Sequence, residues 1–135
     1  DAVDSVRLLE ALAAEARKLG RAAVPCLAEV NVSGEAQKYG VKPTELEAFL
    51  RRTGELPELD LRGLMTMAPY ADAPEHVEQI SRPVFRGLRE LLAKANASGW
   101  YARPLTELSM GMTNDYAIAV EEGATMVRVG TGLFL

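Results

Sequence analysis

Short apolar runs alternate with longer amphipathic stretches along this chain. The apolar runs, each of a length suited to a buried strand, span 24–32, 59–68, 105–110 and 125–129. The stretches that carry apolar residues near helical spacing span 4–20, 44–53, 74–97 and 115–122. None of the apolar runs alternates cleanly with polar residues, which is typical of strands covered on both faces. The order α-βα-βα-βα-β predicts an α/β fold, with a parallel sheet and right-handed crossovers.

Local signals predict where the helices begin, end and bend. Asp4-Ser5 is expected to cap the first helix and Gly20 to close it. Thr44 and Glu47 have the spacing of a capping box, which predicts the start of the second helix. Pro83 predicts a break or kink in the third helix, because proline lacks the backbone N–H and crowds the preceding turn.

The last two predicted strands end in a similar way. The run 109–115 is a strand end and a glycine-bearing turn, and the short helix that starts at Asn114 or Asp115 closes at Gly123. The run 124–131 is a buried strand that ends in Gly-Thr. Hydroxyls, backbone N–H groups and glycines at neighbouring strand ends are typical of a phosphate site, and in a (β/α)8 barrel the loops after the last two strands hold phosphate. Each residue alone is better explained as a turn or cap residue, but the two turns in tandem favour phosphate.

Size and composition restrict the class of protein. A length of 135 residues with 48% hydrophobic residues predicts one domain with a substantial core. The net charge of −4 gives no electrostatic reason to expect nucleic acid or an anionic membrane surface as a partner. The chain has no apolar run of transmembrane length and no signal-peptide pattern. The single cysteine, Cys26, lies in an apolar run and is expected to be a small buried hydrophobe, so the expected location is the cytoplasm.

Four segments resemble the pyridoxal-phosphate homeostasis proteins, which are small barrels related to the N-terminal domain of alanine racemase. They occur in the order of the family and together cover nearly the whole chain. They are VNVSGE at 30–35 with Lys38 and Gly40, RGLMTMAP at 62–69, LSMGMT at 108–113 with Asp115, and GATMVRVGT at 123–131. Thr113 stands where the family usually has serine, and it keeps the hydroxyl.

The resemblance implies a TIM-type (β/α)8 barrel of which this chain is only a part. Residues 1–135 are expected to form a single partial domain, the C-terminal half, with barrel strands five to eight and the helix before them. The Schiff-base lysine of the family lies on the first strand, so it is expected in the missing N-terminal half. The inner face of the four strands is expected to be apolar and open, with unpaired strand edges. The missing half is expected to come from the same polypeptide, another chain or a second copy of this one.

The resemblance also implies how pyridoxal 5'-phosphate (PLP) is bound. The phosphate is expected to contact Ser109, Thr113 and the backbone of Gly130 and Thr131. By similarity to alanine racemase, Arg128 is expected to donate to the unprotonated pyridine nitrogen, which makes the ring a poor electron sink. A structural ion pair between Arg128 and a barrel carboxylate is the alternative. Met65 is expected to pack against the ring, although core filling explains a methionine there equally well.

The function that these features favour is a non-catalytic carrier that binds and buffers PLP inside the cell. A PLP-dependent amino-acid racemase of the same barrel type is the alternative. Such racemases need a second domain and a tyrosine base, and no tyrosine of this chain lies in a motif of that kind. A phosphate-binding barrel unrelated to pyridoxal is a third possibility.

Overall fold

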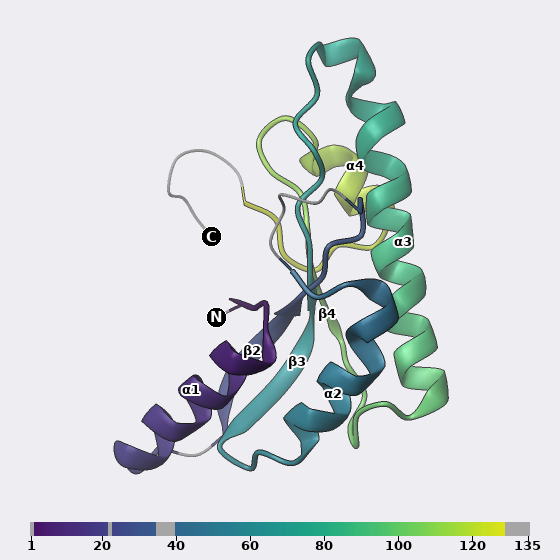
Figure 1. Cartoon of the computed structure of the whole chain (residues 1–135). Coiled ribbons are helices and arrows are strands. Elements are labelled where there is room, and N and C mark those ends of the chain that lie inside the picture. The colour runs from purple at the N-terminus through teal and green to yellow at the C-terminus, as the bar shows by residue number, and fades with distance from the viewer. Residues whose placement is uncertain (1, 22, 35–39, 129–135) are drawn as a thin grey trace.

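The structure is a computed structural model that describes residues 2–21, 23–34 and 40–128. Four strands form one parallel sheet in the order β1-β2-β3-β4, and each strand is followed along the chain by a helix (Figure 1). The strands are β1 (Ala2–Val3), β2 (Val24–Glu29), β3 (Leu59–Met65) and β4 (Glu107–Ser109). The α-helices are α1 (Val6–Lys18), α2 (Leu46–Gly54), α3 (Val77–Ser98) and α4 (Tyr116–Glu121), and the 3-10 turns η1 (Pro43–Glu45) and η2 (Pro74–His76) precede α2 and α3. The α/β class and the parallel sheet predicted from the sequence are confirmed.

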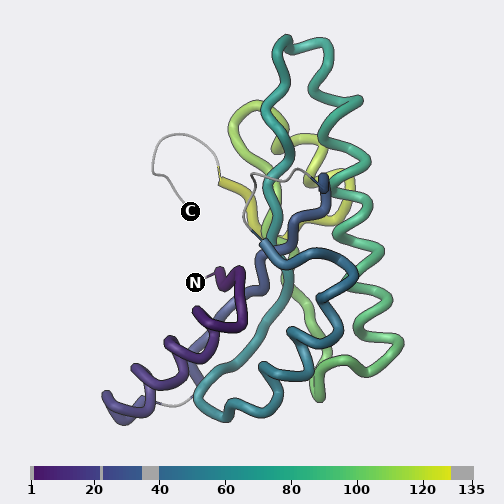
Figure 2. Tube along the Cα trace, viewed as in Figure 1, coloured from purple at the N-terminus to yellow at the C-terminus, as the bar shows by residue number. Residues whose placement is uncertain are grey.

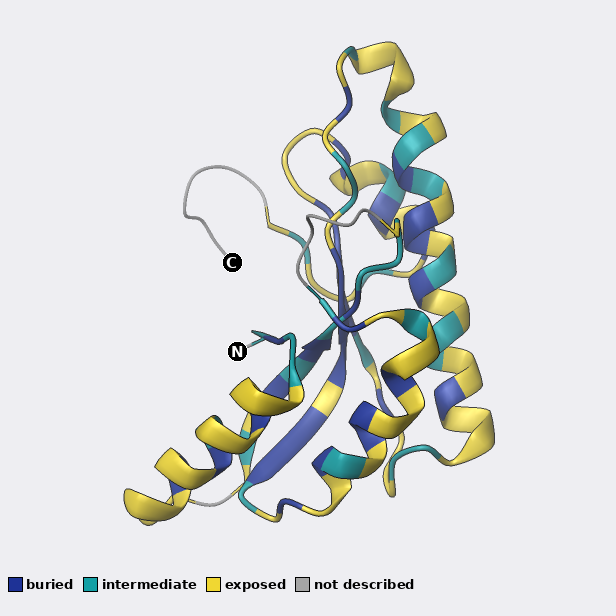
Figure 3. Cartoon of the chain, in the orientation of Figure 1, coloured by how far each residue is buried: buried dark blue, intermediate teal, exposed yellow. Residues whose placement is uncertain are grey.

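One face of the sheet carries the helices and the core of the protein. Cys26 and Ala28 of β2 and Leu64 of β3 are almost fully buried, and they belong to the same core cluster as Leu9 of α1 and Phe85 of α3. Figure 3 shows the buried residues of α2 and α3 facing β3, while the outer sides of these helices are exposed. The burial of Cys26 confirms its role as a small hydrophobe, and burial raises the pKa of its thiol to about 11.

The opposite face of the sheet is not covered by any helix of the described residues. A hollow of about 330 Å³ lies on it, between β2, β3 and β4, and Leu27, Arg62, Glu107 and Met126 are among its lining residues. The prediction of an apolar inner face was therefore wrong in part, because Arg62 and Glu107 line this hollow together with four apolar residues, Pro25, Cys26, Leu27 and Met126. Arg62 points to this face because successive strand residues alternate, and its neighbour Leu61 lies opposite the helix-facing Cys26. The register shifts directly after it, so that Leu27 is opposite Gly63.

The predicted strand 125–129 is present only in part. Met126 forms a parallel bridge with Ser109, so this segment lies beside β4, as the path of the chain in Figure 2 shows. The Leu108 N–H is accepted at 2.8 Å by the side-chain hydroxyl of Thr125 and not by a backbone carbonyl. Side-chain pairing therefore replaces part of the ladder, and no extended strand is assigned over 125–128. Residues from Val129 onward lie outside the described residues.

The helix ends agree with only some of the sequence signals. Ser5 caps α1, since its hydroxyl accepts the Leu8 N–H at 3.1 Å. The capping box was wrong, because the chain enters α2 through the 3-10 turn η1 and no side chain caps the helix at Glu45. Of the break or kink predicted at Pro83, the break was wrong, since α3 is assigned without interruption from Val77 to Ser98, and the kink stays a prediction. Pro83 is exposed, so the carbonyl that it leaves without a partner can be hydrated.

Candidate functional site

The ends of β4 and of the segment after α4 lie side by side, as the sequence predicted. Ser109 pairs with Met126, the Met110 N–H donates to the Met126 carbonyl at 3.1 Å, and the Arg128 N–H donates to the Gly111 carbonyl at 2.8 Å. The bonds continue beyond the end of β4, so they align the two segments at the carboxyl edge of the sheet. This edge of a parallel sheet is where α/β proteins bind their ligands.

A row of side chains crosses the sheet at this level. Glu29, the last residue of β2, is opposite Met65, the last residue of β3, and Met65 is opposite Ser109. Residues in register on parallel strands point to the same face, so all three are on the side away from the helix-facing Ala28 and Leu64. Ser109 is 5% exposed and Met65 is 3% exposed. The sequence expected both at one ligand site, and the structure places them on adjacent strands.

The charged groups near this row are the Arg128 guanidinium and the carboxylates of Glu29 and Asp4. Arg128 is exposed and lies two residues after Met126. Burial raises the pKa of the half-buried Glu29 carboxyl above its usual value, nearby Asp4 raises it further, and the positive charge of Arg128 opposes both effects. The structure gives no ion pair between Arg128 and any described residue, so a structural ion pair has no support in the described part of the chain.

The loop between β4 and α4 is held by a buried carboxylate. Asp115 is 7% exposed, and its Oδ1 accepts the Met112 N–H at 2.7 Å while its Oδ2 accepts the Ser81 hydroxyl of α3 at 3.0 Å. Although Asp115 occupies the N-cap position of α4, its carboxylate caps no N–H of that helix. Thr113 lies on this loop and is exposed.

The far end of α4 is anchored to the same helix. Glu122 is 3% exposed, and its carboxylate lies 2.8 Å from Arg82, 3.1 Å from Arg86 and 3.1 Å from Arg89, all on α3. Hydrogen bonds from Arg86 and Arg82 lower the pKa of the Glu122 carboxyl. Both ends of the short helix α4 are therefore attached to α3, which fixes the loop that carries Thr113.

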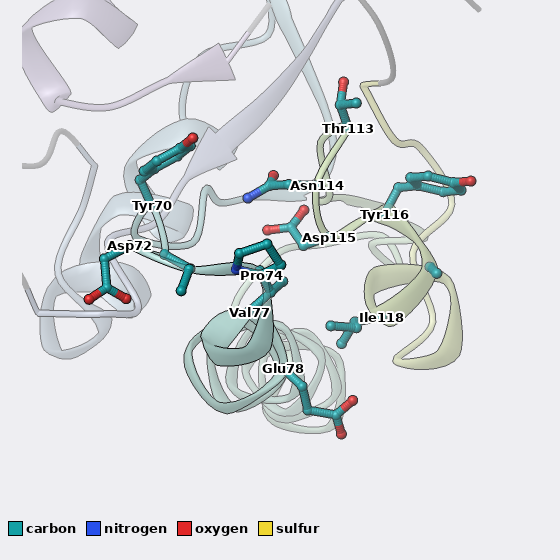
Figure 4. Close-up of a pocket in the computed structure, with 13 residues that line it drawn as sticks. Tyr70, Asp72, Pro74, Val77, Glu78, Thr113, Asn114, Asp115, Tyr116 and Ile118 are labelled. Carbon is teal, nitrogen blue, oxygen red and sulfur yellow. The ribbon is translucent and has the colours of Figure 1, made fainter.

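Another hollow lies next to this loop on the side of α3. Its cavity volume is about 570 Å³, and Tyr70, Val77, Asn114 and Tyr116 are among its lining residues. Figure 4 shows Asn114 and Asp115 in its middle, with Val77 on one side and Thr113 on the other. Its carboxylates already have partners, since Asp72 pairs with His76 and Glu78 with Arg82. No lysine or arginine is among its described lining residues, so this hollow offers no positive charge for an anionic ligand. The edge of the sheet at Met65 and Ser109, near Arg128, is the better candidate.

The hydrogen-bond donors near this edge of the sheet suit an anionic phosphate ester with a ring nitrogen. A serine hydroxyl at the end of β4, a threonine hydroxyl on the next loop and an exposed guanidinium are hydrogen-bond donors of the kind that phosphate and pyridine nitrogen accept. The remaining residues predicted to contact phosphate, Gly130 and Thr131, lie outside the described residues. Within the described ranges no group of three or more metal-ligating side chains occurs, and no helix is both long and apolar enough to cross a bilayer.

Sequence reasoning missed several residues of this region. Ser81 was detectable, because it lies on the buried side of α3 with Val84 and Leu88, and a polar residue on such a stripe needs a partner. Glu29 was also detectable, because it is a charged residue within the apolar run 24–32. The contact of Glu122 with three arginines has no local sequence signal, because its partners lie more than 30 residues earlier in the chain.

Comparisons with known proteins identify the family. Residues 2–135 match the family described as "Alanine racemase, N-terminal domain". A pyridoxal phosphate homeostasis protein of Pseudomonas aeruginosa is 41% identical over 134 residues, which is 98% of this chain and 53% of the relative. A protein of the same description from Aquifex aeolicus is 49% identical over 108 residues, or 80% of this chain and 45% of the relative.

A solved structure gives the same result in three dimensions. The structure of PipY from Synechococcus elongatus PCC7942 with PLP bound superposes with a TM-score of 0.77 at 34% identity, and the match covers 95% of this chain and 56% of PipY. The chain therefore spans about half the length of the relatives that it matches. From its sequence and its fold, the chain belongs to the alanine racemase N-terminal domain family, and within it to the pyridoxal phosphate homeostasis proteins.

Proposed function

We propose that this chain is the C-terminal half of a PLP-binding (β/α)8 barrel that serves PLP homeostasis as a non-catalytic intracellular carrier. In this proposal β2, β3, β4 and the segment 125–128 are strands five to eight, and β1, which pairs with β2, is the end of strand four. Residues 1–135 form one partial domain of that barrel. The missing N-terminal half, from the same polypeptide, another chain or a second copy, covers the open face of the sheet. PLP is the ligand, and nucleic acid and membranes are not partners.

The alignment of the two last strand ends carries this proposal. The segment that carries the Ser109 hydroxyl and the segment that carries the Arg128 guanidinium lie together at one edge of the sheet. They are joined by the bridge between Ser109 and Met126 and by the bond from the Arg128 N–H to the Gly111 carbonyl. A relative of the same fold, PipY, has been solved with PLP bound. The open face of the sheet explains why a second half is required, since it exposes Leu27 and Met126 together with two charged groups.

The residues of this chain have distinct tasks in the proposal. Ser109 and Thr113, with the backbone of Gly130 and Thr131, hold the phosphate, because hydrogen bonds to a dianion are short and strong. Arg128 donates to the pyridine nitrogen and keeps it unprotonated. PLP, when bound, supplies an aldehyde that reacts with amines, and the lysine for it is expected on the first strand of the missing half. Met65 packs against the ring.

The test uses a chain of the relatives' full length that contains this segment, called here the full-length chain. One PLP per chain, measured by absorbance after dialysis, together with no racemisation of amino acids, is the expected result. Binding of phosphate esters in general, without preference for PLP, would indicate an unrelated phosphate barrel. Rapid racemisation of an amino acid would overturn the carrier function and indicate the racemase.

A further inference from the structure

We propose that Ser81 and Asp115 are positioning residues for the phosphate-binding loop, so that removing their hydrogen bond weakens the binding of PLP but not of pyridoxal, which lacks the phosphate. This inference deepens the proposed function and rests on it. Neither residue is expected to touch the ligand. Their contribution comes from the order that they impose on the turn from Gly111 to Asn114.

The Asp115 carboxylate accepts hydrogen bonds from the loop and from α3, and none from the first turn of its own helix. An aspartate at an N-cap normally accepts an N–H from the first turn of the helix, but the Asp115 side chain makes no such bond in α4. Its two oxygens instead join Met112 of the loop to Ser81 of α3, at 2.7 and 3.0 Å. A carboxylate that is 7% exposed needs such partners, because a buried charge without hydrogen bonds is costly.

Ser81 is placed on a rigid support. It is 1% exposed and lies in the 22-residue helix α3, on the stripe that also contains the fully buried Phe85 and Leu88. The loop itself is tied to the neighbouring segment, since the Gly111 carbonyl accepts the Arg128 N–H at 2.8 Å. The bond from Ser81 therefore connects the helix layer to the loop that carries Thr113.

The loop has little freedom to rearrange around these bonds. Gly111 has a φ of +105°, and a Cβ at this position would lie 2.6 Å from the Cβ of Ala119 in α4. The turn is thus packed directly on α4, and the Asp115 N–H closes it on the Met112 carbonyl at 3.1 Å. A ligand that binds an ordered loop does not have to supply the free energy of ordering it.

The test compares two near-isosteric removals of a buried hydroxyl in the full-length chain. Ser81→Ala removes the bond to Asp115. Thr53→Val is the matched control, because Thr53 is fully buried in α2 and its hydroxyl donates only to Phe49 of the same helix, at 2.9 Å. Equilibrium dialysis gives the affinity of each variant for PLP and for pyridoxal, and urea unfolding gives its stability.

We expect Ser81→Ala to bind PLP about tenfold more weakly, equal to about 1.4 kcal/mol, with its affinity for pyridoxal unchanged. Thr53→Val should lose stability but keep the wild-type ratio of the two affinities. Asp115→Asn keeps an acceptor for Met112 and a polar contact to Ser81, so its PLP affinity should stay within about threefold of wild type.

Two results would overturn the inference. One is that Ser81→Ala keeps the wild-type ratio of the affinities for PLP and pyridoxal. The other is that this ratio falls as much in Thr53→Val as in Ser81→Ala. A wild-type chain that binds pyridoxal as tightly as PLP, or that binds neither, would overturn the proposed phosphate site itself. The failure of the proposed function is therefore visible in the wild-type protein, before any variant is compared.

Discussion

Replacement of Gly63 by alanine should separate β3 from β4 and disturb the site at their ends. A Cβ built at Gly63 lies 1.9 Å from the carbonyl oxygen of Glu107, 2.6 Å from its carbonyl carbon and 2.8 Å from its Cα. All three are backbone atoms, so no side-chain rotation relieves the overlap. Non-bonded carbon and oxygen atoms approach to about 3.3 Å, so β4 must move by more than about 1 Å.

The cost of this movement follows from the contacts that it breaks. Overpacking of a well-packed interior costs about 1–3 kcal/mol. The bond from the Thr106 N–H to the Arg62 carbonyl, 2.9 Å, and the bond from the Thr66 N–H to the Ser109 carbonyl, 3.1 Å, join the two strands, and each backbone bond contributes about 1 kcal/mol. The expected loss in the free energy of unfolding is about 3 kcal/mol or more.

Gly54→Ala is the control for the same chemical change. Gly54 is the last residue of α2 and its φ is not positive. Apart from its chain neighbours and the nearby backbone of its own helix, no atom lies within 4 Å of the position that an alanine Cβ would occupy. Alanine there should stabilise the protein by about 0.5–1 kcal/mol, because glycine loses more backbone entropy on folding. Urea unfolding of both variants in the full-length chain measures the difference, and a dialysis titration measures the loss of PLP affinity in Gly63→Ala. If Gly63→Ala were as stable as the wild type, β3 and β4 would not be paired in the register described.

Three further outcomes are expected. Glu122→Gln should destabilise the full-length chain at neutral pH, because the pKa of Glu122 is lowered from its usual value of 4.5 in the folded state. The difference in unfolding free energy from wild type, measured with urea, should shrink as the pH falls below about 4.5 and disappear below the folded pKa. A difference that does not change with pH would contradict the role of the charge. The Cys26 thiol, buried and with its pKa raised to about 11, should react with iodoacetamide at pH 8 only after unfolding, so rapid labelling of the native protein would show that β2 is open. The 135-residue chain alone should self-associate through the open face of the sheet, and sedimentation that gives a compact monomer in dilute solution would show that the half barrel is stable by itself.

The sequence predicted the elements whose signals are local. The apolar runs predicted β2 and β3, and the serine before the first helical stretch predicted the cap at Ser5 that the structure confirms. The strand β1 was missed because its two residues, Ala2 and Val3, are too few to form a pattern, and only their register with Leu27 and Ala28 reveals it. The mixed polarity of the open face was missed because the register shift between β2 and β3 interrupts the alternation of β3 directly after Arg62.

The residues of the site also divide into those with a local sequence signal and those without one. Ser109, Met65 and Arg128 were proposed as site residues from strand ends and from the resemblance, and the structure brings the ends that carry them together. Their contact with a ligand stays a prediction. The link between Asp115 and Ser81 spans 34 residues of sequence, so only the packing of α4 on α3 creates it. Contacts of this kind depend on the tertiary arrangement and cannot be deduced from periodicity.

The proposed position of the PLP phosphate, at Ser109 and Thr113, is tested by the affinity of the Ser109→Ala/Thr113→Ala variant for PLP. The variant removes two hydrogen bonds to a doubly charged group, each worth about 1.5–3 kcal/mol, so PLP should bind about 100-fold or more weakly to the full-length chain. Arg128→Gln, which can still donate to the ring nitrogen, should lose less affinity in the same equilibrium dialysis. A double variant that binds PLP as tightly as the wild type would contradict the account, because the phosphate would then lie elsewhere.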